Sequence, residues 1–448
     1  MSDKSRGTWN SRFGYIMAAA GFSIGLGNIW RFPYLVGTNG GGAFVLVYLL
    51  ICIFIGIPLF YMEVTLGRKA QASPIAGMRK LTKKGSPWTV FGWLGVLSAF
   101  FILTYYIQIM GWIMNYLIKM ATGEMAGFTA EQYSTTFSKM IENPVLLVVL
   151  TLACTLIVGF ISAKNLNDGL EKACKFMMPA LFIMLLLVVV RSVTLPNAIE
   201  GVKWYMNVDF SKINSESILA ALGQCFFSVG IASGGAFVYG SYLNKDSDIP
   251  SDGLMVIGFD ALAALIAGFA IFPAVFALNL PVDSGSNLLF ITMSNVFMNL
   301  PFGRFFGVLF FLLMFFAALS SALGYLEPVS SSFSELLKVD RKKGVIYALT
   351  SIFLVGLLTI FGQNILKSVS IFGRNMFDFA DFLSGNILMP LGAIALVLYT
   401  IFKWKFDVFR DDINNGAQSF KIPGFLKYIS YIIPLVLIVI FLTGLGLF

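Results

Sequence analysis

The sequence predicts an all-α membrane protein, a bundle of eleven membrane-spanning helices of which the first and sixth are discontinuous. Composition is the first observation, because 58% of the 448 residues are hydrophobic and 12% are charged, against about 25% charged residues in soluble domains. The second is a series of apolar segments long enough to cross a hydrocarbon core, which needs about 20 residues per helix. The third is the presence, inside two of these segments, of glycines and polar residues that weaken a helix.

The predicted spans cover residues 13–37, 42–66, 88–120, 144–162, 168–190, 216–242, 253–279, 304–336, 345–362, 376–402 and 427–447. They form a single domain, residues 1–448. Lysine and arginine gather in the N-terminal segment and in the loops around 68–84, 338–343 and 403–427, which predicts a cytoplasmic N-terminus. Eleven spans then place the C-terminus outside. The outer regions 191–215 and 281–301 are long, and short helices or ordinary surface loops fit them equally well.

Charge and residue types exclude several functions. The net charge of +8 comes from basic residues in short loops between spans, as the positive-inside rule expects, so no nucleic-acid partner is predicted. Cys52, Cys154, Cys174 and Cys225 lack metal-ligand spacing and are interpreted as packing residues. The chain contains no histidine, and this absence removes the commonest general base and transition-metal ligand. A coupling ion is therefore expected to be a hard cation bound by oxygens. The polar start runs directly into a span, and we expect no cleaved signal peptide.

The first interrupted segment is GFSIGLGNIWRFP, residues 21–33. Arginine at membrane depth is costly unless it faces protein or water. Irregular backbone is tolerated there only where it is buried in protein or lines a cavity. The second interrupted segment is GQCFFSVGIASGGAFVYGSY, residues 223–242. The glycines alone also suit close helix packing, but Asn28, Arg31, Gln224 and Ser228 favour a binding site.

Two interrupted helices five spans apart predict an inverted repeat of five helices, with a transporter binding site between the repeats. The first repeat covers about residues 13–190 and the second about 216–402. An extra helix covers about 427–447.

Sequence motifs in a fixed order carry a family resemblance. GFSIGLGNIWRFP is followed by NGGGAF (39–44), GIPLFYMEVTLGR (56–68), GQCFFS (223–228), SYLNKDSDI (241–249) and LSSALGYLEP (319–328). Across the whole chain this pattern resembles a prokaryotic, eleven-span member of the neurotransmitter:sodium symporter family. The resemblance implies the LeuT-type 5+5 inverted-repeat fold and sodium-driven uptake of a small amino acid or amine. Unwound carbonyls suit a hard cation, and a half-helix N-terminus attracts a carboxylate.

The resemblance implies two sodium sites. One would use the carbonyls of Gly21, Ile24 and Ala317 with the hydroxyls of Ser320 and Ser321. Adjacent serines in a helix also commonly bond back to their own backbone, and this alternative remains open.

The other site would use the Ser23 carbonyl, the Asn28 and Ser228 side chains, and Asp260. The family usually has asparagine at position 260, and chloride-independent relatives place a carboxylate one turn later, where this chain has Ala264. Our hypothesis is that Asp260 both binds sodium and supplies the negative charge that chloride brings elsewhere. Chloride is therefore not expected to be required.

The same resemblance places the substrate. Its carboxylate would lie near the amides of Leu26 and Gly27 with the Tyr106 hydroxyl, and its ammonium near carbonyls around Ser23, Phe227 and Ser228. Gly25 stands where carriers of amines tend to have an acid, so an α-amino acid is favoured. The side-chain pocket would be mostly apolar, with small residues that leave room for a large hydrophobic or aromatic L-amino acid. Its lining would be Phe22, Ile102, Phe227, Gly230, Ser233, Ser320, Gly324 and Tyr325.

Two gates complete the implied site. The outer gate would be Arg31 with Asp381, above Tyr106 and Phe227, although an arginine near the interface can also snorkel to headgroups. The inner gate would be Arg6 with Glu335, with Trp9, Ser241 and Tyr242 packed below. A basic tail held by anionic lipids is the alternative for this set. Glu63 is expected to satisfy backbone groups left free by the two breaks.

The predicted function is a sodium-coupled symporter in the inner cell membrane, crossing it many times. Its partners would be sodium, a small amino acid and the lipid bilayer. An amino-acid sensor with the same site but no turnover is the first alternative, although the chain carries no large signalling domain or tail. A channel would show no saturable exchange. An enzyme is not expected, since the chain has no histidine and no Gly-x-Ser-x-Gly or Walker motif.

Overall fold

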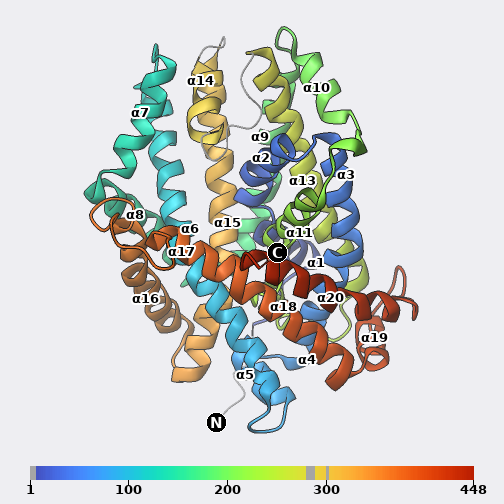
Figure 1. Ribbon diagram of the computed structural model, residues 1–448. Helices are drawn as coiled ribbons and strands as arrows, with labels where there is room; N and C mark the ends of the chain where they lie inside the picture. Colours follow the sequence, from blue (N-terminus) through green and yellow to red (C-terminus); the bar gives the residue numbers. More distant parts are fainter. Residues whose placement is uncertain (1–6, 279–287, 299–301, 448) are drawn as a thin grey trace.

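The computed structural model describes residues 7–278, 288–298 and 302–447. Within these residues the chain is helical, with no strand apart from an isolated bridge between Ile371 and Arg374. The helices pack side by side as one bundle (Figure 1). The predicted class, an all-α membrane protein, is confirmed.

In the described part of the chain, nine helices are long and apolar enough to cross a membrane. The uninterrupted ones include α8 (Pro144–Ser162), α13 (Ile249–Ala277), α15 (Gly303–Leu337) and α16 (Arg341–Phe361). Three more contain a π-helical or 3-10 turn: η3 (Pro87–Thr89) with α6 (Val90–Thr122), η4 (Asn167–Glu171) with α9 (Lys172–Val193), and α3 (Gly42–Ile51) with η2 (Cys52–Gly56) and α4 (Ile57–Ala70). The last two are α20 (Leu426–Gly444) and the series α17 (Met376–Phe382), η7 (Leu383–Leu388), α18 (Met389–Leu398) and η8 (Tyr399–Trp404).

The first predicted span is bent. Helix α1 (Arg12–Ser23) is followed by the π-helical turn η1 (Gly27–Arg31) and α2 (Phe32–Thr38), and the two parts meet at 50°. At the bend the backbone of Ile24 is extended, with φ −75° and ψ 94°. Gly25 lets this backbone approach its neighbours, because a Cβ atom there would lie 2.5 Å from Ser321 Oγ and 2.9 Å from the Tyr106 hydroxyl. With this bent pair taken as one span, ten spans meet the length and composition criteria.

The predicted sixth span is also broken, as expected. It consists of α11 (Ser215–Val229) and α12 (Gly235–Gly240), each too short to cross a membrane alone. The count of eleven spans therefore stays a prediction, since this segment fails the length criterion. Gly230 and Gly234 adopt left-handed φ angles of +67° and +76°, which glycine tolerates and other residues resist.

Glu63 of α4 explains how the second break is tolerated. Its side chain is fully buried and accepts hydrogen bonds from the amides of Ala232 (2.8 Å) and Gly234 (3.1 Å). Buried amides outside a helix need such partners. The prediction that Glu63 satisfies freed backbone groups is confirmed for the break between α11 and α12.

Short helices occupy the ends of the bundle. Those in the predicted outer regions are α7 (Ala130–Ile141), α10 (Ala198–Met206), η5 (Phe210–Lys212), η6 (Leu288–Thr292) and α14 (Met293–Met298); α5 (Pro74–Leu81) and α19 (Phe406–Asn414) lie in predicted inner loops. Figure 1 shows α7, α10 and α14 at one end, and α5 at the other. Short helices, one of the two expectations for regions 191–215 and 281–301, are present, while residues 281–287 and 299–301 lie outside the described residues.

The two breaks lie in the middle of the bundle. Helix α1 packs against α9, α13 and α15, and the long helices α6 and α15 pack against each other over much of their length. The four cysteines are buried and unpaired, consistent with their interpretation as packing residues. Within the described residues, no group of three or more cysteine, aspartate or glutamate side chains could hold a metal ion. Any cation site must therefore use carbonyl, hydroxyl and amide oxygens beside at most two carboxylates.

Candidate binding site at the two helix breaks

Besides Glu63, a second buried acid, Asp260 of α13, contacts residues of both interrupted segments. It is fully buried, and its carboxylate accepts hydrogen bonds from Asn28 Nδ2 (2.8 Å), Ser228 Oγ (2.9 Å) and the Tyr48 hydroxyl (3.5 Å). These donors, from η1, α11 and α3, are all neutral. A buried carboxylate is strongly disfavoured unless a cation or further hydrogen bonds compensate for lost solvation. The structure thus brings together three side chains of one predicted sodium site, those of Asn28, Ser228 and Asp260, around a buried carboxyl group with only neutral donors.

The Asn28 amide shows how this cluster is arranged. Its nitrogen also donates to the Asp260 carbonyl (2.9 Å), while its oxygen accepts from the Gly25 amide (3.1 Å). The Asn28 oxygen accepts this one hydrogen bond and has a second lone pair for a further donor or a cation. Beside it, the Gln224 side chain donates to the Gly27 carbonyl (2.8 Å), and its own oxygen is buried without a partner in the described structure. The sequence predicts a binding site near Gln224 but does not assign this side chain a ligand.

The second predicted sodium site lies between α1 and α15. Ser321 Oγ donates to the carbonyls of Phe22 (3.0 Å) and Gly21 (3.4 Å), so it crosses from one helix to the other. Ser320 Oγ instead donates to the Ala317 carbonyl in its own helix (3.1 Å), the behaviour that adjacent serines commonly show. Ile24 follows at the bend. The residues predicted for this site therefore lie on two neighbouring helices, and their binding of sodium stays a prediction.

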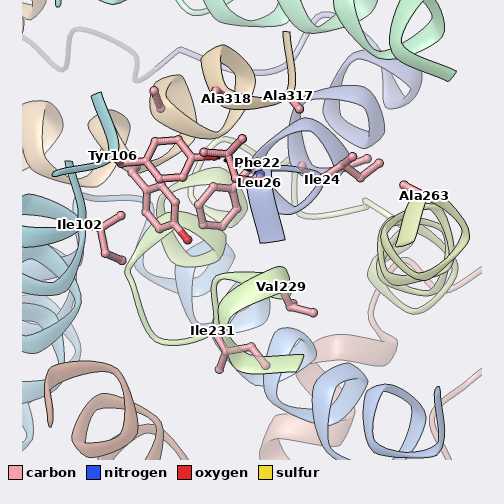
Figure 2. Packing of buried hydrophobic residues seen from close by; sticks show 14 of the residues in the cluster. Phe22, Ile24, Leu26, Ile102, Tyr106, Val229, Ile231, Ala263, Ala317 and Ala318 are labelled. Atoms are coloured by element: carbon pink, nitrogen blue, oxygen red, sulfur yellow. Dashed lines mark hydrogen bonds between the residues drawn. The ribbon is translucent and has the colours of Figure 1, made fainter. Parts of the chain in front are cut away.

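The predicted carboxylate site is formed by the start of η1 and by α6. The Leu26 amide donates to the Tyr106 hydroxyl at 3.4 Å, so the two groups meant to hold a carboxylate face each other. Figure 2 shows Tyr106 of α6 next to Phe22 and Leu26, with Ile102 of the same helix further to the left. Gly27 lies against the other break, since a Cβ atom there would be 3.0 Å from Phe227 Cδ1. Nearby, Ser23 Oγ donates to the Val229 carbonyl (3.5 Å).

Phe22 changes the interpretation of the side-chain pocket. Its ring packs edge-on against Tyr325, with centroids 4.9 Å apart. A Cβ atom on Gly230 would lie 2.8 Å from Phe22 Cε1, and one on Gly324 would lie 2.8 Å from its Cγ. These glycines therefore make room for the Phe22 ring. The Ser233 hydroxyl donates to the Gly230 carbonyl (2.6 Å), so it is used within the break.

An open cavity of 510 Å³ lies on the outer side of these residues. Its lining includes Tyr106 and Phe227 together with both predicted outer-gate residues, Arg31 and Asp381. The Arg31 guanidinium stacks 5.0 Å from the Phe227 ring centre and donates to the Gly223 carbonyl (3.4 Å). Arg31 and Asp381 thus face the same cavity, but in the described structure they make no ion pair within 4.0 Å.

Aromatic residues from α12 and from the segment before α1 pack together on the predicted inner side. Trp9 Nε1 donates to the Tyr239 carbonyl (3.1 Å), and the Trp9 ring contacts Tyr242 edge-on at 6.0 Å. Ser241 is fully buried beside them. The expected packing of Trp9, Ser241 and Tyr242 is therefore present. Arg6 lies outside the described residues. Glu335 accepts hydrogen bonds from the Ser73 amide (3.0 Å) and hydroxyl (2.8 Å).

Sequence analysis missed an inner ionic network. Arg341 at the start of α16 donates to both carboxylate oxygens of Glu327 in α15 (2.6 and 2.8 Å), and the Tyr242 hydroxyl donates to the first of them (2.6 Å). Glu327 is fully buried. The available signal was an acid inside an apolar span, in the LSSALGYLEP motif. Such residues are functional candidates by default.

Comparison with known proteins identifies the class of this site. The family model described as the sodium:neurotransmitter symporter family matches residues 6–137 and 131–447. The chain belongs to this family. A sodium-dependent transporter of Bacillus subtilis is 37% identical over 452 residues, covering 100% of this chain and 99% of the relative. A sodium-dependent transporter of Haemophilus influenzae is 36% identical over 458 residues, covering 99% of each.

A solved structure agrees with the architecture. The crystal structure of MhsT in complex with L-phenylalanine matches with a TM-score of 0.89 and 36% identity, over 98% of this chain and 100% of that one. The chain is therefore a multi-pass, sodium-dependent membrane transporter with the LeuT-type fold, whose first and sixth segments are discontinuous. As a member of a transporter family it is not an enzyme.

Proposed function

We propose that this member of the family is a sodium-coupled symporter that takes up a large hydrophobic or aromatic L-amino acid by alternating access. The observation that carries the proposal is the Asp260 cluster. A fully buried carboxylate with only neutral donors lies beside Asn28 and Ser228, between two helix breaks. Low-dielectric surroundings and a ready set of oxygens favour a hard, desolvated cation at this position.

Two sodium ions would be carried. The first would bind to the Ser23 carbonyl, Asn28, Ser228 and Asp260. The second would bind to the carbonyls of Gly21, Ile24 and Ala317 and to the hydroxyls of Ser320 and Ser321. At the second position a cation would take over carbonyl oxygens that side chains of this chain now bond, because Ser321 donates to the Gly21 carbonyl and Ser320 to the Ala317 carbonyl. The negative charge of Asp260 would make chloride unnecessary.

The substrate would lie against the carboxylate site at Leu26 and Gly27. Its carboxylate would accept hydrogen bonds from these amides and from Tyr106, which would turn from the Leu26 amide that it faces here. Its ammonium would meet carbonyls around Ser23, Phe227 and Ser228. The matching structure is that of MhsT in complex with L-phenylalanine, which supports an aromatic substrate.

The predicted apolar lining for the substrate side chain would be Phe22, Ile102, Phe227, Gly230, Ser233, Ser320, Gly324 and Tyr325. Since the Phe22 ring now lies against Gly230 and Gly324, we infer that it swings aside, or packs edge-on against the substrate, when an aromatic side chain enters.

Alternating access would use the two gates. Arg31 and Asp381 would close over the outer cavity when substrate is bound. To form an ion pair, the two side chains would have to move closer together than they are in this structure. Arg6 with Glu335, and the packing of Trp9 and Tyr242, would close the inner side. We further propose that residues 13–190 and 216–402 form inverted repeats in one domain. The N-terminus would lie in the cytoplasm and the C-terminus outside the inner cell membrane.

Radiolabelled amino-acid uptake into proteoliposomes tests this function. An inward sodium gradient should drive uptake with or without chloride, and unlabelled tyrosine, tryptophan, phenylalanine or leucine should compete better than alanine. Sodium-dependent binding without accumulation would instead support the sensor. No binding of any amino acid would contradict the proposed carboxylate site, and dependence on chloride would contradict the role of Asp260.

A further inference from the structure

Glu171 is a buried acid that the transport argument has not used. It ends the π-helical turn η4, where α9 begins on the inner side, and only 1% of its surface is exposed. Ionised side chains are rarely buried to this degree unless they are paired or hydrogen-bonded. The partners of Glu171 therefore indicate which segment its carboxylate holds in place.

The partners of Glu171 lie at the start of α1. The Asn10 amide donates to Glu171 Oε2 (2.9 Å), and the Ser11 hydroxyl donates to Oε1 (3.3 Å). Ser11 is also the N-cap of α1, where its side chain accepts a hydrogen bond from the Gly14 amide (3.0 Å). Lys175, one turn further along α9, makes an ion pair with Glu171 (2.6 Å). One carboxylate thus binds both the backbone and the capping side chain that begin the helix.

The contact between Glu171 and α1 is close. A Cβ atom on Gly14 would lie 2.6 Å from Glu171 Cγ, so the glycine lets the acid reach the helix. The first turn of α1 contains no acidic residue of its own. Negative charge near a helix N-terminus stabilises it through the free amides and the helix dipole. Glu171 supplies such a charge from another helix.

The opposite face of the same turn is held by α13. Arg12 Nε lies 2.5 Å from Asp252 Oδ1, and its Nη2 donates to Ser251 Oγ (2.8 Å). The start of α1 is therefore fixed between α9 and α13. Because α1 is a single helix from Arg12 to Ser23, a displacement of its inner end is transmitted to Gly21, in the last turn beside the break.

We propose that Glu171 is a positioning residue of the inner gate. It holds the cytoplasmic end of α1 against α9 while the outer cavity is open, and its bonds to Asn10 and Ser11 break when the site opens to the cytoplasm. The inference rests on the alternating access proposed above. Loss of the Glu171 carboxylate should shift the protein toward the inward-open state.

Two reporter cysteines measure this shift without any substrate. The first is Ser241→Cys, which reports the inner side because Ser241 is fully buried there. The second is Gly385→Cys, which reports the outer side because Gly385 lines the open cavity and has free space around it. The four native cysteines are buried. The rate of reaction with a thiol reagent is compared in sodium and in potassium.

In Glu171→Ala, we expect the inner reporter to react about fivefold faster or more in sodium than in the parent protein, a typical conformational coupling. The outer reporter should react more slowly. Glu171→Gln, which keeps the side-chain volume, should give an intermediate shift in the same directions. The control is Glu200→Ala, which removes an exposed glutamate from a similar ion pair with Lys203 (2.8 Å) and should change neither rate.

Opposite changes at the two reporters separate gating from general loosening, which would accelerate both reactions. Unchanged rates in Glu171→Ala and Glu171→Gln, or equal acceleration at both reporters, would overturn the inference about Glu171. If sodium changes neither reporter in the parent protein, alternating access itself fails and the inference falls with it. Failure of amino-acid uptake alone would leave these rates unaffected, so it contradicts the proposed substrate or its transport and not the inference about Glu171.

Discussion

At the scale of single residues, Asp260 and Tyr106 have separate tasks that can be tested independently. Asp260 provides a carboxyl group in a buried cluster of neutral donors, whereas Tyr106 provides one hydroxyl beside the Leu26 amide. A charge acts on the coupling ion over several ångströms in a poorly screened interior. A hydroxyl acts only on a group that it touches. Substitutions at the two positions should therefore affect different ligands.

Asp260→Asn removes the charge but keeps an oxygen ligand. We expect the sodium concentration for half-maximal binding to rise about tenfold or more in chloride-free buffer, equivalent to about 1.4 kcal/mol. Added chloride should partly restore binding by supplying the missing charge. Sodium titrations in chloride and in gluconate measure both effects. Asp209→Asn, at a partly exposed loop position, is the control, and parent-like sodium binding by Asp260→Asn in gluconate would contradict the role of the charge.

Tyr106→Phe removes the hydroxyl next to the Leu26 amide. The dissociation constant for the amino acid should rise about tenfold, since hydrogen bonds to charged groups contribute roughly 1.5–3 kcal/mol. Sodium binding without substrate should change little. Tyr116→Phe in the same helix is a matched control, because its buried hydroxyl has no partner in the described structure. Equal affinities of the two variants in a scintillation binding assay would exclude Tyr106 as a carboxylate ligand.

At the scale of helices, each break depends on glycine and on a partner that satisfies the freed backbone. The break between α11 and α12 has two glycines at left-handed φ angles and the Glu63 carboxylate on its amides. The bend after α1 has Gly25 pressed toward Ser321 and Tyr106. Irregular backbone in a bilayer survives only where it is buried in this way. Both breaks are consequently buried in protein, with glycine at the points of closest contact.

Gly230→Ala tests the second break. The left-handed conformation costs a residue with a Cβ atom roughly 1–2 kcal/mol, and the new methyl group would overlap the Phe22 ring. We expect a lower melting temperature in detergent together with weakened amino-acid binding. Gly258→Ala, in α13 with nothing within 4 Å of its Cβ position, should be neutral or stabilising. A Gly230→Ala protein with parent stability and affinity would contradict this account of the break.

At the scale of the whole molecule, much of the fold could be predicted from sequence. In the site, only the residues that belong to family motifs could be predicted. Apolar length and interrupted segments identified the bundle and both breaks, because the bilayer imposes strict constraints on backbone. The convergence of Asn28, Ser228 and Asp260 followed from family resemblance. The filling of the glycine space by Phe22, and the partners of Glu327 and Glu171, depend on contacts between distant segments that no local pattern encodes.

The largest-scale prediction concerns the coupling of the two ligands through the entire bundle. If substrate and sodium bind at adjoining sites between the same breaks, each must raise the affinity for the other by the same factor. Sodium titrations at several amino-acid concentrations, and the converse, measure both factors in purified protein. Sodium alone should also raise the melting temperature relative to potassium at equal ionic strength, since binding at 100 times the dissociation constant adds about 2.7 kcal/mol. Amino-acid affinity that is the same in sodium and in potassium would mean that the two sites are uncoupled, and the adjoining arrangement at the breaks would then be wrong.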